Sequence, residues 1–436
     1  MNRRRTAMHQ RRKRLPLVIL PALVLVGCTA APAPSTQTHS SSASSPNTRA
    51  PITIPTPTPV TSSADTSPRD PGTTAMPSPS PSAKPSAVPL DAAHRQLATM
   101  SRKEKIGQVL MVGVPATGSN SADLSIITRN ALGNVFLKGR SSRGSAATGE
   151  VVERINTAIV KGTAAEITPY VATDQEGGNV QVLRGAGFST LPTALVQGSW
   201  DATTLTHRAT KWGKELAAVG INLNLAPVAD TVSSASFAPS NGPIGQWKRE
   251  YGYTPEAVSR ASQAFTKGMG AAGVDSVIKH FPGLGRVTQN TDIVKNVIDT
   301  KTTRNDPYLA PFRAGIAAGN EWVMVSNSYY SKIDAKNIAP FSSTIMRGML
   351  REDLGFTGVI ISDDMCYATQ LSPWGYATRA VRFFEAGGTM MLCVNAGKLD
   401  QISEALAEQA KKDPGFARLI DAAALKVLEA KQDEGS

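Results

Sequence analysis

Eight short apolar segments, separated by helix-like segments, follow one another along the chain from Ser101 onward. Short apolar runs bounded by turn residues are typical of buried strands, and their alternation with helices is typical of parallel β/α units. The predicted strands are residues 109–112, 134–137, 170–173, 221–226, 274–278, 322–325, 359–361 and 390–394. Eight such units predict an α/β protein with a closed (β/α)8 barrel of the TIM type, rather than a β-sandwich.

The intervening segments contain helix start and stop signals. Asp201 is suited to cap a helix that runs to Ala218, and Pro255 is suited to the first turn of another helix. Ser342 begins a third segment with amphipathic spacing. Further helices are predicted over residues 399–411 and 417–431.

The first 92 residues differ in composition from the rest of the 436-residue chain. Residues 29–90 consist mainly of Pro, Ser, Thr and Ala, with almost no large apolar side chains. Such a segment cannot bury enough apolar surface to offset its conformational entropy. Residues 28–92 are therefore predicted to be a disordered linker, and residues 93–436 a single barrel domain.

The N-terminus has the features of a secretion signal. A basic segment precedes an apolar run at residues 15–26, which is too short to span a bilayer and leads into Leu25-Val26-Gly27-Cys28. This ending resembles the lipobox of bacterial lipoproteins, which predicts a signal peptide over residues 1–27 and a lipidated Cys28. Lipidation would anchor the protein to the extracytoplasmic face of the bacterial cell membrane. An ordinary signal with a chance cysteine is the alternative.

The net charge of +12 at first suggests a nucleic-acid partner. Seven of the basic residues precede Cys28, however, and removal of residues 1–27 leaves a charge of +5, which is ordinary for a soluble domain. No basic run with interleaved aromatic residues follows, so a nucleic-acid partner is not expected. Nothing in the sequence fixes an oligomeric state.

Cys366 and Cys393 are the cysteines that remain after Cys28. Both lie in apolar or strand-like surroundings, which predicts buried thiols rather than a disulfide or a metal site. The histidines of the folded part lie far apart in the sequence, and no phosphate-binding glycine loop is present. We therefore expect no metal and no nucleotide cofactor.

Polar residues follow several predicted strands at the point where each strand ends. They are Asp174, Asp230, Lys279-His280, Ser326-Asn327 and Asp363-Asp364. The carboxyl ends of the strands of a (β/α)8 barrel form one rim, and that rim carries the active site. Each residue taken alone could simply terminate a strand, but five such positions on one rim indicate a functional site.

Three segments that contain these polar residues form a recognisable set: residues 174–178 (DQEGG), 279–285 (KHFPGLG) and 358–364 (GVIISDD). Together they resemble glycoside hydrolase family 3 and are specific for it, and residues 224–230 (NLAPVAD) are similar to a fourth segment of the family. The resemblance runs from about Lys103 to Val394 in the family's order. It implies a (β/α)8 barrel that binds carbohydrate and hydrolyses glycosidic bonds.

Asp363 matches the nucleophile of the family. A carboxylate at this position can form and release a glycosyl ester at the anomeric carbon. Asp364 is the competing residue, but successive side chains of a strand point in opposite directions, so at most one of the two is expected to face the barrel axis. The sequence favours Asp363, with Asp364 as a surface or loop-stabilising residue.

The resemblance also implies a set of sugar contacts. Asp174 matches an aspartate that accepts hydrogen bonds from sugar hydroxyls, and Lys279 and His280 match a pair of donors to the same sugar. A lysine beside carboxylates is expected to stay charged and to keep them ionised. For His280 a satisfied core histidine is the alternative.

Two arginines complete the predicted sugar contacts. Arg249 matches the family's sugar-contacting arginine if two residues are inserted before it, and Lys248 is its competitor. The family places another arginine eight residues after Asp174, where this chain has Val182. Arg184 is the nearest arginine and is predicted to take that role.

The chain departs from the family at the proton donor. Single-barrel β-N-acetylglucosaminidases of the family carry Asp-Ser-His in the loop after the fifth strand, and the matching positions here are Asn290-Thr291-Asp292. No other histidine is placed to replace the missing one, and no second domain is expected after Val394 to supply a glutamate. Asp292 could act as acid and base if burial or neighbouring carboxylates raise its pKa. A turn-capping role for Asp292 and a different proton donor are the alternatives.

Two functions are compatible with these residues. The first is a retaining exo-glycosidase that hydrolyses terminal β-N-acetylhexosaminides of cell-wall type through a glycosyl-Asp363 intermediate. The second is a lipoprotein of the same fold that binds sugar but has lost turnover. The altered loop at residues 290–292 favours the second function, whereas the joint presence of Asp363, Asp174, Lys279 and His280 favours the first.

Overall fold

The computed structural model describes residues 91–164 and 167–433. The predicted signal peptide, the predicted lipidation at Cys28 and almost all of the predicted linker lie outside these residues, so they stay predictions. The first described helix, α1 (Ala92–Thr99), begins at the last residue of the predicted linker, and the Asp91 side chain caps it.

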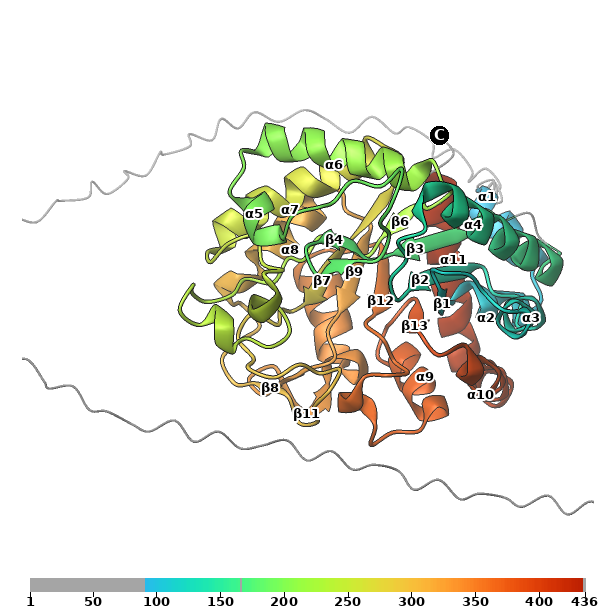
Figure 1. Ribbon diagram of the computed structural model, residues 1–436. Helices are drawn as coiled ribbons and strands as arrows, with labels where there is room; N and C mark the ends of the chain where they lie inside the picture. Colours follow the sequence, from blue (N-terminus) through green and yellow to red (C-terminus); the bar gives the residue numbers. More distant parts are fainter. Residues whose placement is uncertain (1–90, 165–166, 434–436) are drawn as a thin grey trace, which may run out of the picture. The chain divides into compact units, whose positions relative to one another are not determined.

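Eight parallel strands form a barrel (Figure 1). They are β1 (Leu110–Pro115), β2 (Asn134–Lys138), β3 (Tyr170–Thr173), β6 (Leu223–Asn224), β7 (Asp275–Phe281), β9 (Trp322–Val325), β12 (Val359–Ser362) and β13 (Met391–Cys393). Each strand pairs with the next in that order from β1 to β12, and β13 pairs with β1. A parallel bridge between Ile361 and Met390 then brings the two ends of the sheet together. The predicted barrel and the places of its eight strands are confirmed.

Strand β6 is shorter than predicted. The apolar run extends to Ala226, but the strand ends at Asn224. Pro227 has no N–H to donate to a neighbouring strand, which interrupts the ladder. Pairing resumes beyond the proline, where Val228 forms an isolated bridge with Lys279 of β7.

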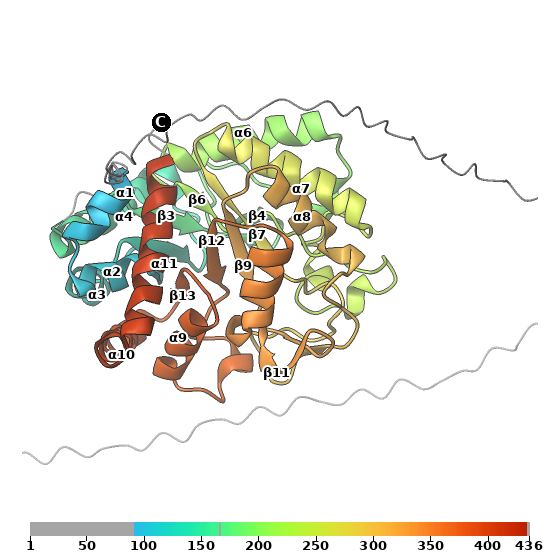
Figure 2. The same ribbon diagram turned by 180° about the vertical axis from the view of Figure 1, so that it is seen from behind.

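Helices cover the outside of the barrel (Figures 1 and 2). The principal ones are α2 (Arg102–Gln108), α3 (Ser121–Arg129), α4 (Gly144–Gly162), α6 (Ala202–Ala217), α7 (Pro255–Gly270), α8 (Ala310–Ala317), α9 (Tyr376–Glu385), α10 (Leu399–Lys412) and α11 (Pro414–Asp433). The predicted signals hold, since Asp201 accepts a hydrogen bond from the Thr204 N–H and Pro255 is the first residue of α7.

The helix predicted after Ser342 has wider turns than an α-helix. It is the π-helix η5 (Thr344–Asp353). Its buried residues include Ile345, Met349 and Leu350, at spacings of four and five. A π-helix bonds residues five apart, so its wider turn brings these side chains onto one face.

Strand alternation separates two parts of the core. Trp322 and Met324 of β9 belong to the cluster that fills the barrel interior, whereas Val323 and Val325 belong to the cluster beneath the helices. The same alternation holds in β12, where Val359 and Ile361 face the interior. This pattern decides which residues beyond the strand ends face into the barrel.

Helix α11 covers the amino-terminal end of the barrel (Figure 2). Its residues Val427 and Ala430 join the interior cluster, and the Tyr170 hydroxyl at the start of β3 donates to Ala430 O (3.0 Å). Lys431 Nζ donates to Gly133 O, just before β2 (3.1 Å). These contacts close the interior at the end opposite to the polar rim.

Short strands that were not predicted lie in the segments that follow the barrel strands. A hairpin of β4 (Gln175–Gly177) and β5 (Val180–Gln181) follows β3, and a small sheet is formed by β8 (Ile298–Asp299), β10 (Tyr329–Tyr330) and β11 (Asp334–Ile338). In the part of the chain that the structure describes, no helix has the length and apolar character needed to cross a membrane.

Candidate active site

A cavity of about 330 Å³ lies at the rim formed by the carboxyl ends of the strands. Asp174 follows β3, Lys279 and His280 belong to β7, and Asp363 follows β12. The remaining polar side chains of the lining come mainly from loops: Arg140, Asn179, Arg249, Asn290, Thr291, Asp292 and Asp364. The barrel thus brings together residues that are far apart in the sequence.

A larger hollow of about 830 Å³ lies outside the barrel, along α6, α7 and α8. His207 and Arg260 are among its lining residues, but none of them carries a carboxylate. It therefore lacks the groups needed for carboxylate-based acid, base or nucleophilic chemistry. The smaller cavity at the rim is the candidate active site.

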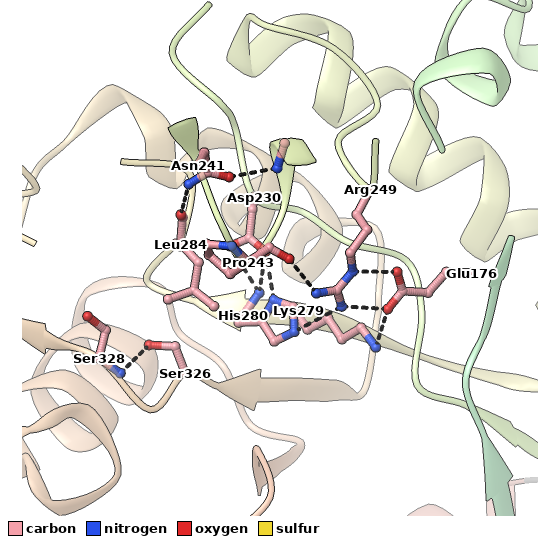
Figure 3. A network of polar contacts seen from close by, with 12 residues as sticks. Glu176, Asp230, Asn241, Pro243, Arg249, Lys279, His280, Leu284, Ser326 and Ser328 are labelled. Atoms are coloured by element: carbon pink, nitrogen blue, oxygen red, sulfur yellow. Dashed lines mark hydrogen bonds and ion pairs between the residues drawn. The ribbon is translucent and has the colours of Figure 1, made fainter. Parts of the chain in front are cut away.

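Four charged side chains form a continuous network at one side of the cavity, and Figure 3 shows three of them, Glu176, Arg249 and Lys279. Lys279 Nζ lies 2.7 Å from Asp174 Oδ1 and 2.6 Å from Glu176 Oε1. Arg249 binds the same Glu176 carboxylate through Nε (2.8 Å) and Nη2 (2.7 Å). This arrangement fixes Lys279 and Arg249 in place before any ligand binds.

The network keeps its buried members charged. Burial by itself raises the pKa of Glu176, but the Arg249 and Lys279 charges outweigh it and lower that pKa to about 2. Burial by itself lowers the pKa of Lys279, but Asp174 and Glu176 outweigh it and raise that pKa. Lys279 is therefore a permanent cationic donor in the cavity wall, as the sequence predicted.

His280 is held by Asp230, which is fully buried. The Nδ1 atom of His280 lies 2.7 Å from Asp230 Oδ2, and the His280 N–H and the Leu284 N–H also donate to the same carboxylate. The opposite ring nitrogen, Nε2, lies 3.4 Å from Arg249 Nη2 and is directed to the charged wall (Figure 3). Asp230 thus fixes the ring orientation, while His280 lines the cavity.

Asp363 faces the barrel interior. Val359 and Ile361 of β12 face the interior. Asp363 follows them at a spacing of two residues, so its side chain points in the same direction. Its N–H donates to Val325 O of the neighbouring strand, and its Oδ1 accepts from the Asp364 N–H (2.7 Å). The carboxylate is therefore anchored through one oxygen, which leaves Oδ2 for a reacting atom.

The pKa of Asp363 lies above its usual value of 3.8. Burial is the main cause, and the nearby Asp292 carboxylate adds to it, whereas His280 and Lys279 act in the opposite direction. Asp363 is thus a poorly hydrated carboxylate close to cationic groups.

Asp364 stabilises the adjacent loops. Its Oδ1 accepts from the N–H groups of Cys366 (3.0 Å) and Val394 (2.9 Å), and its Oδ2 accepts from the Tyr367 N–H (2.7 Å). The predicted loop-stabilising role is confirmed, because all three contacts are with backbone groups of two neighbouring loops.

Asn290 supplies the side chain that caps the turn around Asp292. Asn290 Oδ1 accepts from the Asp292 N–H (2.9 Å), and the Asn290 carbonyl accepts from the Ile293 and Val294 N–H groups. The Asp292 carbonyl accepts from the Thr369 N–H, which joins this loop to the one after β12. The turn is thus capped by Asn290, and the Asp292 side chain lines the cavity.

The pKa of Asp292 is raised from 3.8. Asp292 reaches solvent, but the cavity walls surround its carboxylate, and the resulting loss of hydration is the main cause. Arg249 and His280 lower the pKa and Asp364 raises it. A carboxylate with a raised pKa at a cavity mouth has the property that a proton donor needs.

Comparison with known proteins identifies the family. Residues 101–430 match the model described as the glycosyl hydrolase family 3 N terminal domain, which is most of the chain. The chain belongs to glycoside hydrolase family 3. A β-hexosaminidase of Stenotrophomonas maltophilia is 31% identical over 326 residues, which cover 73% of this chain and 92% of that protein. A β-hexosaminidase of Methylococcus capsulatus is 35% identical over 261 residues, which cover 58% of this chain and 74% of that protein.

Solved structures agree with this family assignment. The β-N-acetylhexosaminidase of Beutenbergia cavernae has a TM-score of 0.75 and 48% identity, over 77% of this chain and 99% of that one. A family 3 β-N-acetylglucosaminidase of a Paenibacillus species has a TM-score of 0.70 and 26% identity, over 77% of this chain and 63% of that one. The protein is a glycoside hydrolase.

The two predicted arginine contacts of this family 3 hydrolase have different positions. Arg249 lines the cavity, whereas its competitor Lys248 is exposed and is not among the lining residues. Arg184 is also absent from the lining, and its guanidinium donates to Gly178 O (2.6 Å). Arg140 lines the cavity, whereas Arg184 does not. Arg140 comes from the loop after β2, where no site residue was predicted.

Three other groups of the hydrolase were given no specific role from the sequence, although Asp230 was placed on the rim. Glu176 is the common partner of Lys279 and Arg249, and Asp230 fixes His280. Trp247 lines the cavity from the segment before Arg249. Glu176 lies two residues after Asp174 in the matched segment, and this even spacing at a strand end could have indicated a second acidic group in the site.

The prediction of two buried thiols is wrong, because Cys366 and Cys393 form a disulfide. Their Cα atoms are 5.1 Å apart, although 27 residues separate them in the sequence. Cys393 ends β13 and Cys366 lies in the loop after β12, and closure of the barrel places these two segments side by side. The predicted burial of both cysteines is confirmed. Their pairing could not be predicted, because it depends on the proximity of these two segments in the folded chain.

One group of possible metal ligands occurs within residues 91–164 and 167–433. It consists of Asp91, His94 and Glu429, whose ligand atoms lie within 4.8 Å of one another. His94 already contacts Asp91 and Glu429 pairs with Lys426. None of these residues lines the cavity, so the group has no part in its chemistry.

Glu250, next to Arg249, makes stability depend on pH. It is fully buried, and burial raises its pKa from 4.5 to about 7, although the Tyr253 hydroxyl and Lys248 act in the opposite direction. The folded state therefore holds this proton more tightly than the unfolded chain does. The stabilisation is complete below pH 4.5 and is lost as the pH rises towards 7 and above.

We expect Glu250→Gln to raise the free energy of unfolding at pH 8 by on the order of 2 kcal/mol. At pH 4.5 the gain is expected to be close to zero, because the native glutamic acid is then neutral as well. Urea unfolding at both pH values measures the difference. Glu404→Gln, on an exposed face of α10, is the control and should give the same result at both pH values. A Glu250→Gln gain that does not depend on pH would contradict the raised pKa.

Proposed function

We propose that this family 3 hydrolase is a retaining exo-β-N-acetylhexosaminidase, in which Asp363 is the nucleophile and Asp292 is the acid and base. The observation that carries the proposal is the position of Asp363. This interior carboxylate lines the same small cavity as the fixed side chains Asp174, Lys279, His280 and Arg249. The acetamido specificity is supported by the β-N-acetylhexosaminidase of Beutenbergia cavernae, which shares 48% identity with this chain.

The cavity suits one terminal sugar. Its volume of about 330 Å³ is at the small end of ligand sites. Lys279 donates and Asp174 accepts at the inner wall, so together they can bind neighbouring sugar hydroxyls. An inner end closed by the barrel interior favours release of terminal residues over cleavage within a chain.

In the first chemical step Asp363 attacks the anomeric carbon through Oδ2. The glycosidic C–O bond breaks, and Asp292 transfers its proton to the departing oxygen. The raised pKa of Asp292 makes the protonated form available for this transfer. His280 and Lys279 favour the ionised form of Asp363, which the attack requires.

In the second step water replaces Asp363 at the anomeric carbon. The Asp292 carboxylate removes a proton from the water, the C–O bond to water forms and the ester bond to Asp363 breaks. Two inversions at the same carbon return the β configuration. Asp363 is released as a carboxylate and Asp292 regains its proton, so the site is restored.

The alternative, a sugar-binding protein without turnover, has no support from the comparisons. The altered loop at residues 290–292 was its main argument. In the structure Asn290 caps that loop and Asp292 lines the cavity, so a candidate donor replaces the missing histidine.

Hydrolysis of an aryl β-N-acetylglucosaminide tests the proposal directly. We expect turnover of this substrate, little turnover of the aryl β-glucoside that lacks the acetamido group, and a β-configured first product in proton NMR. An α-configured first product would rule out the retaining mechanism. Sugar binding in calorimetry without turnover would restore the alternative.

We further propose that the protein is exported and anchored by a lipid on Cys28, at the outer face of a bacterial membrane. The proposal rests on Leu25-Val26-Gly27-Cys28, which lies outside the described residues. The Cys366–Cys393 disulfide supports export, because disulfides persist mainly in oxidising compartments.

Cys28→Ala is expected to abolish labelling by a radioactive or clickable fatty acid and to leave an unprocessed or released protein. The reason is that the thiol of Cys28 is the attachment point. Membrane fractionation and lipid labelling in a bacterial host measure both effects. Labelling that persists in Cys28→Ala would refute the anchor.

A further inference from the structure

The barrel closes between β12 and β13, and this junction is less regular than the one on the other side of β12. All residues of β12 pair in register with β9. Between β12 and β13, which lie side by side in Figures 1 and 2, Ile361 and Met390 form an isolated bridge. The Leu392 N–H donates to the Ser362 hydroxyl (2.9 Å), so a side chain supplies an acceptor that a regular parallel ladder takes from the backbone.

The proposed nucleophile lies at this junction, because Asp363 directly follows β12. On the side of β9, its N–H donates to Val325 O (3.1 Å). On the side of β13, the Met365 N–H donates to Leu392 O (2.9 Å), two residues further along the chain. The Asp363 carboxylate itself is anchored by the Asp364 N–H (2.7 Å). Its position therefore depends on how firmly the segment after Asp363 is held against the end of β13.

A carboxylate and a disulfide join that segment to the end of β13. Asp364 Oδ1 accepts from the N–H groups of Cys366 (3.0 Å) and Val394 (2.9 Å). The disulfide connects the same Cys366 to Cys393, the neighbour of Val394, and both cysteines are buried. The covalent link thus spans the junction three residues after the nucleophile.

The disulfide can act in two ways. Closing the 27-residue separation between the cysteines restricts the unfolded chain, which stabilises the fold but does not by itself change the reaction rate. The disulfide also limits how far the two segments can separate in the folded protein. Hydrogen bonds contribute little net free energy each, because water can replace either partner, so they restrain such a separation less firmly than a covalent bond.

We propose that the Cys366–Cys393 disulfide positions the nucleophile, by keeping the Asp364 N–H in place as the anchor of Asp363 Oδ1. Cys366 and Cys393 are thus positioning residues, which act on the reaction through Asp364 and Asp363. A small displacement of an attacking atom lowers the rate of the chemical step strongly. This inference rests on the proposed function, in which Asp363 attacks the anomeric carbon.

The test uses the purified full-length protein and an aryl β-N-acetylglucosaminide, well below the melting temperature. In Cys366→Ala/Cys393→Ala we expect kcat to fall about tenfold, because the Asp363 carboxylate is less often in the reactive position. The dissociation constant of N-acetylglucosamine in calorimetry should change less than about twofold. The reason is that Asp174 and Lys279, which bind the sugar in the proposed function, keep their mutual contact.

Reduction of the wild-type protein makes the same comparison without a substitution, and it replaces the double variant if that variant does not fold. A phosphine gives two electrons to the disulfide, water supplies the two protons of the thiols, and the phosphine takes up the oxygen. Mass spectrometry after alkylation confirms the free thiols. The fall in kcat should match that of the double variant, and oxidised glutathione should restore kcat when it re-forms the disulfide.

Ile159→Ala is the matched control, because Ile159 is buried beneath α4 and does not line the cavity. Its truncation should lower the melting temperature and leave kcat unchanged. Loss of the disulfide with a lower melting temperature but an unchanged kcat would overturn the inference, because the disulfide would then only stabilise the fold. An equally large weakening of sugar binding would overturn it too. A wild-type protein that does not hydrolyse the substrate would instead overturn the proposed function itself.

Discussion

Asp363→Asn is expected to lower kcat on an aryl β-N-acetylglucosaminide by on the order of 10⁴-fold, because an amide cannot form the glycosyl ester. The substitution keeps the size of the side chain and the acceptor that binds the Asp364 N–H. Binding of substrate is therefore expected to change little. Steady-state kinetics and calorimetry with a non-hydrolysed sugar measure the two quantities separately.

Asp364→Asn is the control for this prediction. The asparagine oxygen can still accept from the Cys366 and Val394 N–H groups, and only the contact with the Tyr367 N–H is lost. We expect less than a tenfold loss of kcat, with a modest loss of stability. A slow 5-fluoro glycosyl fluoride should label Asp363 in mass spectrometry. Labelling of Asp364 would show that the nucleophile is assigned to the wrong residue.

Removal of the Asp292 carboxylate is expected to affect substrates according to their leaving group. Asp292→Ala should lower kcat/KM by about 10²-fold or more for a sugar leaving group, which needs protonation as it departs. A dinitrophenyl leaving group needs little protonation, so its release should stay fast while turnover stalls at the second step. Azide needs no base, and it should restore that step and give a β-glycosyl azide.

Asn290→Ala separates this catalytic role from a structural one. Asn290 caps the turn, so its removal loosens the loop but leaves the Asp292 carboxylate in the chain. The expected result is a similar, smaller loss for both leaving groups and no rescue by azide. If Asp292→Ala showed that same uniform pattern, Asp292 would be a turn residue and the donor would have to be another group.

The role of Asp292 in the altered loop at residues 290–292 depends on residues outside that loop. In the sequence, Asn290 and Asp292 are equally suited to cap a turn. In the structure the Asn290 side chain caps it, and Asp292 lies among Arg249, His280 and other carboxylates that shift its pKa. The raised pKa comes mainly from burial of the Asp292 carboxylate by the cavity walls, with a further contribution from Asp364, and these effects outweigh the opposite effect of Arg249 and His280. These groups come from other parts of the chain.

The barrel itself was determined by local sequence. Apolar runs such as residues 170–173 and 322–325 coincide with β3 and β9, because burial on both faces demands continuous apolar residues in a parallel strand. The residues after each run then had to lie on one rim, which places Asp174, Lys279 and Asp363 together. Alternation along the predicted strand indicated that at most one of Asp363 and Asp364 faces the barrel axis, and the family resemblance favoured Asp363.

Tertiary structure alone decided the contacts between segments that are distant in the sequence. The Cys366–Cys393 disulfide, the clamp of Asp230 on His280 and the Glu176–Arg249 ion pair each join two such segments. The same holds for Arg140, which reaches the cavity where Arg184 was expected. The apolar pattern of the sequence indicates which face of a strand or helix is buried, but it does not indicate how close two loops lie. Those distances follow from closure of the barrel and from the paths that the loops take across its rim.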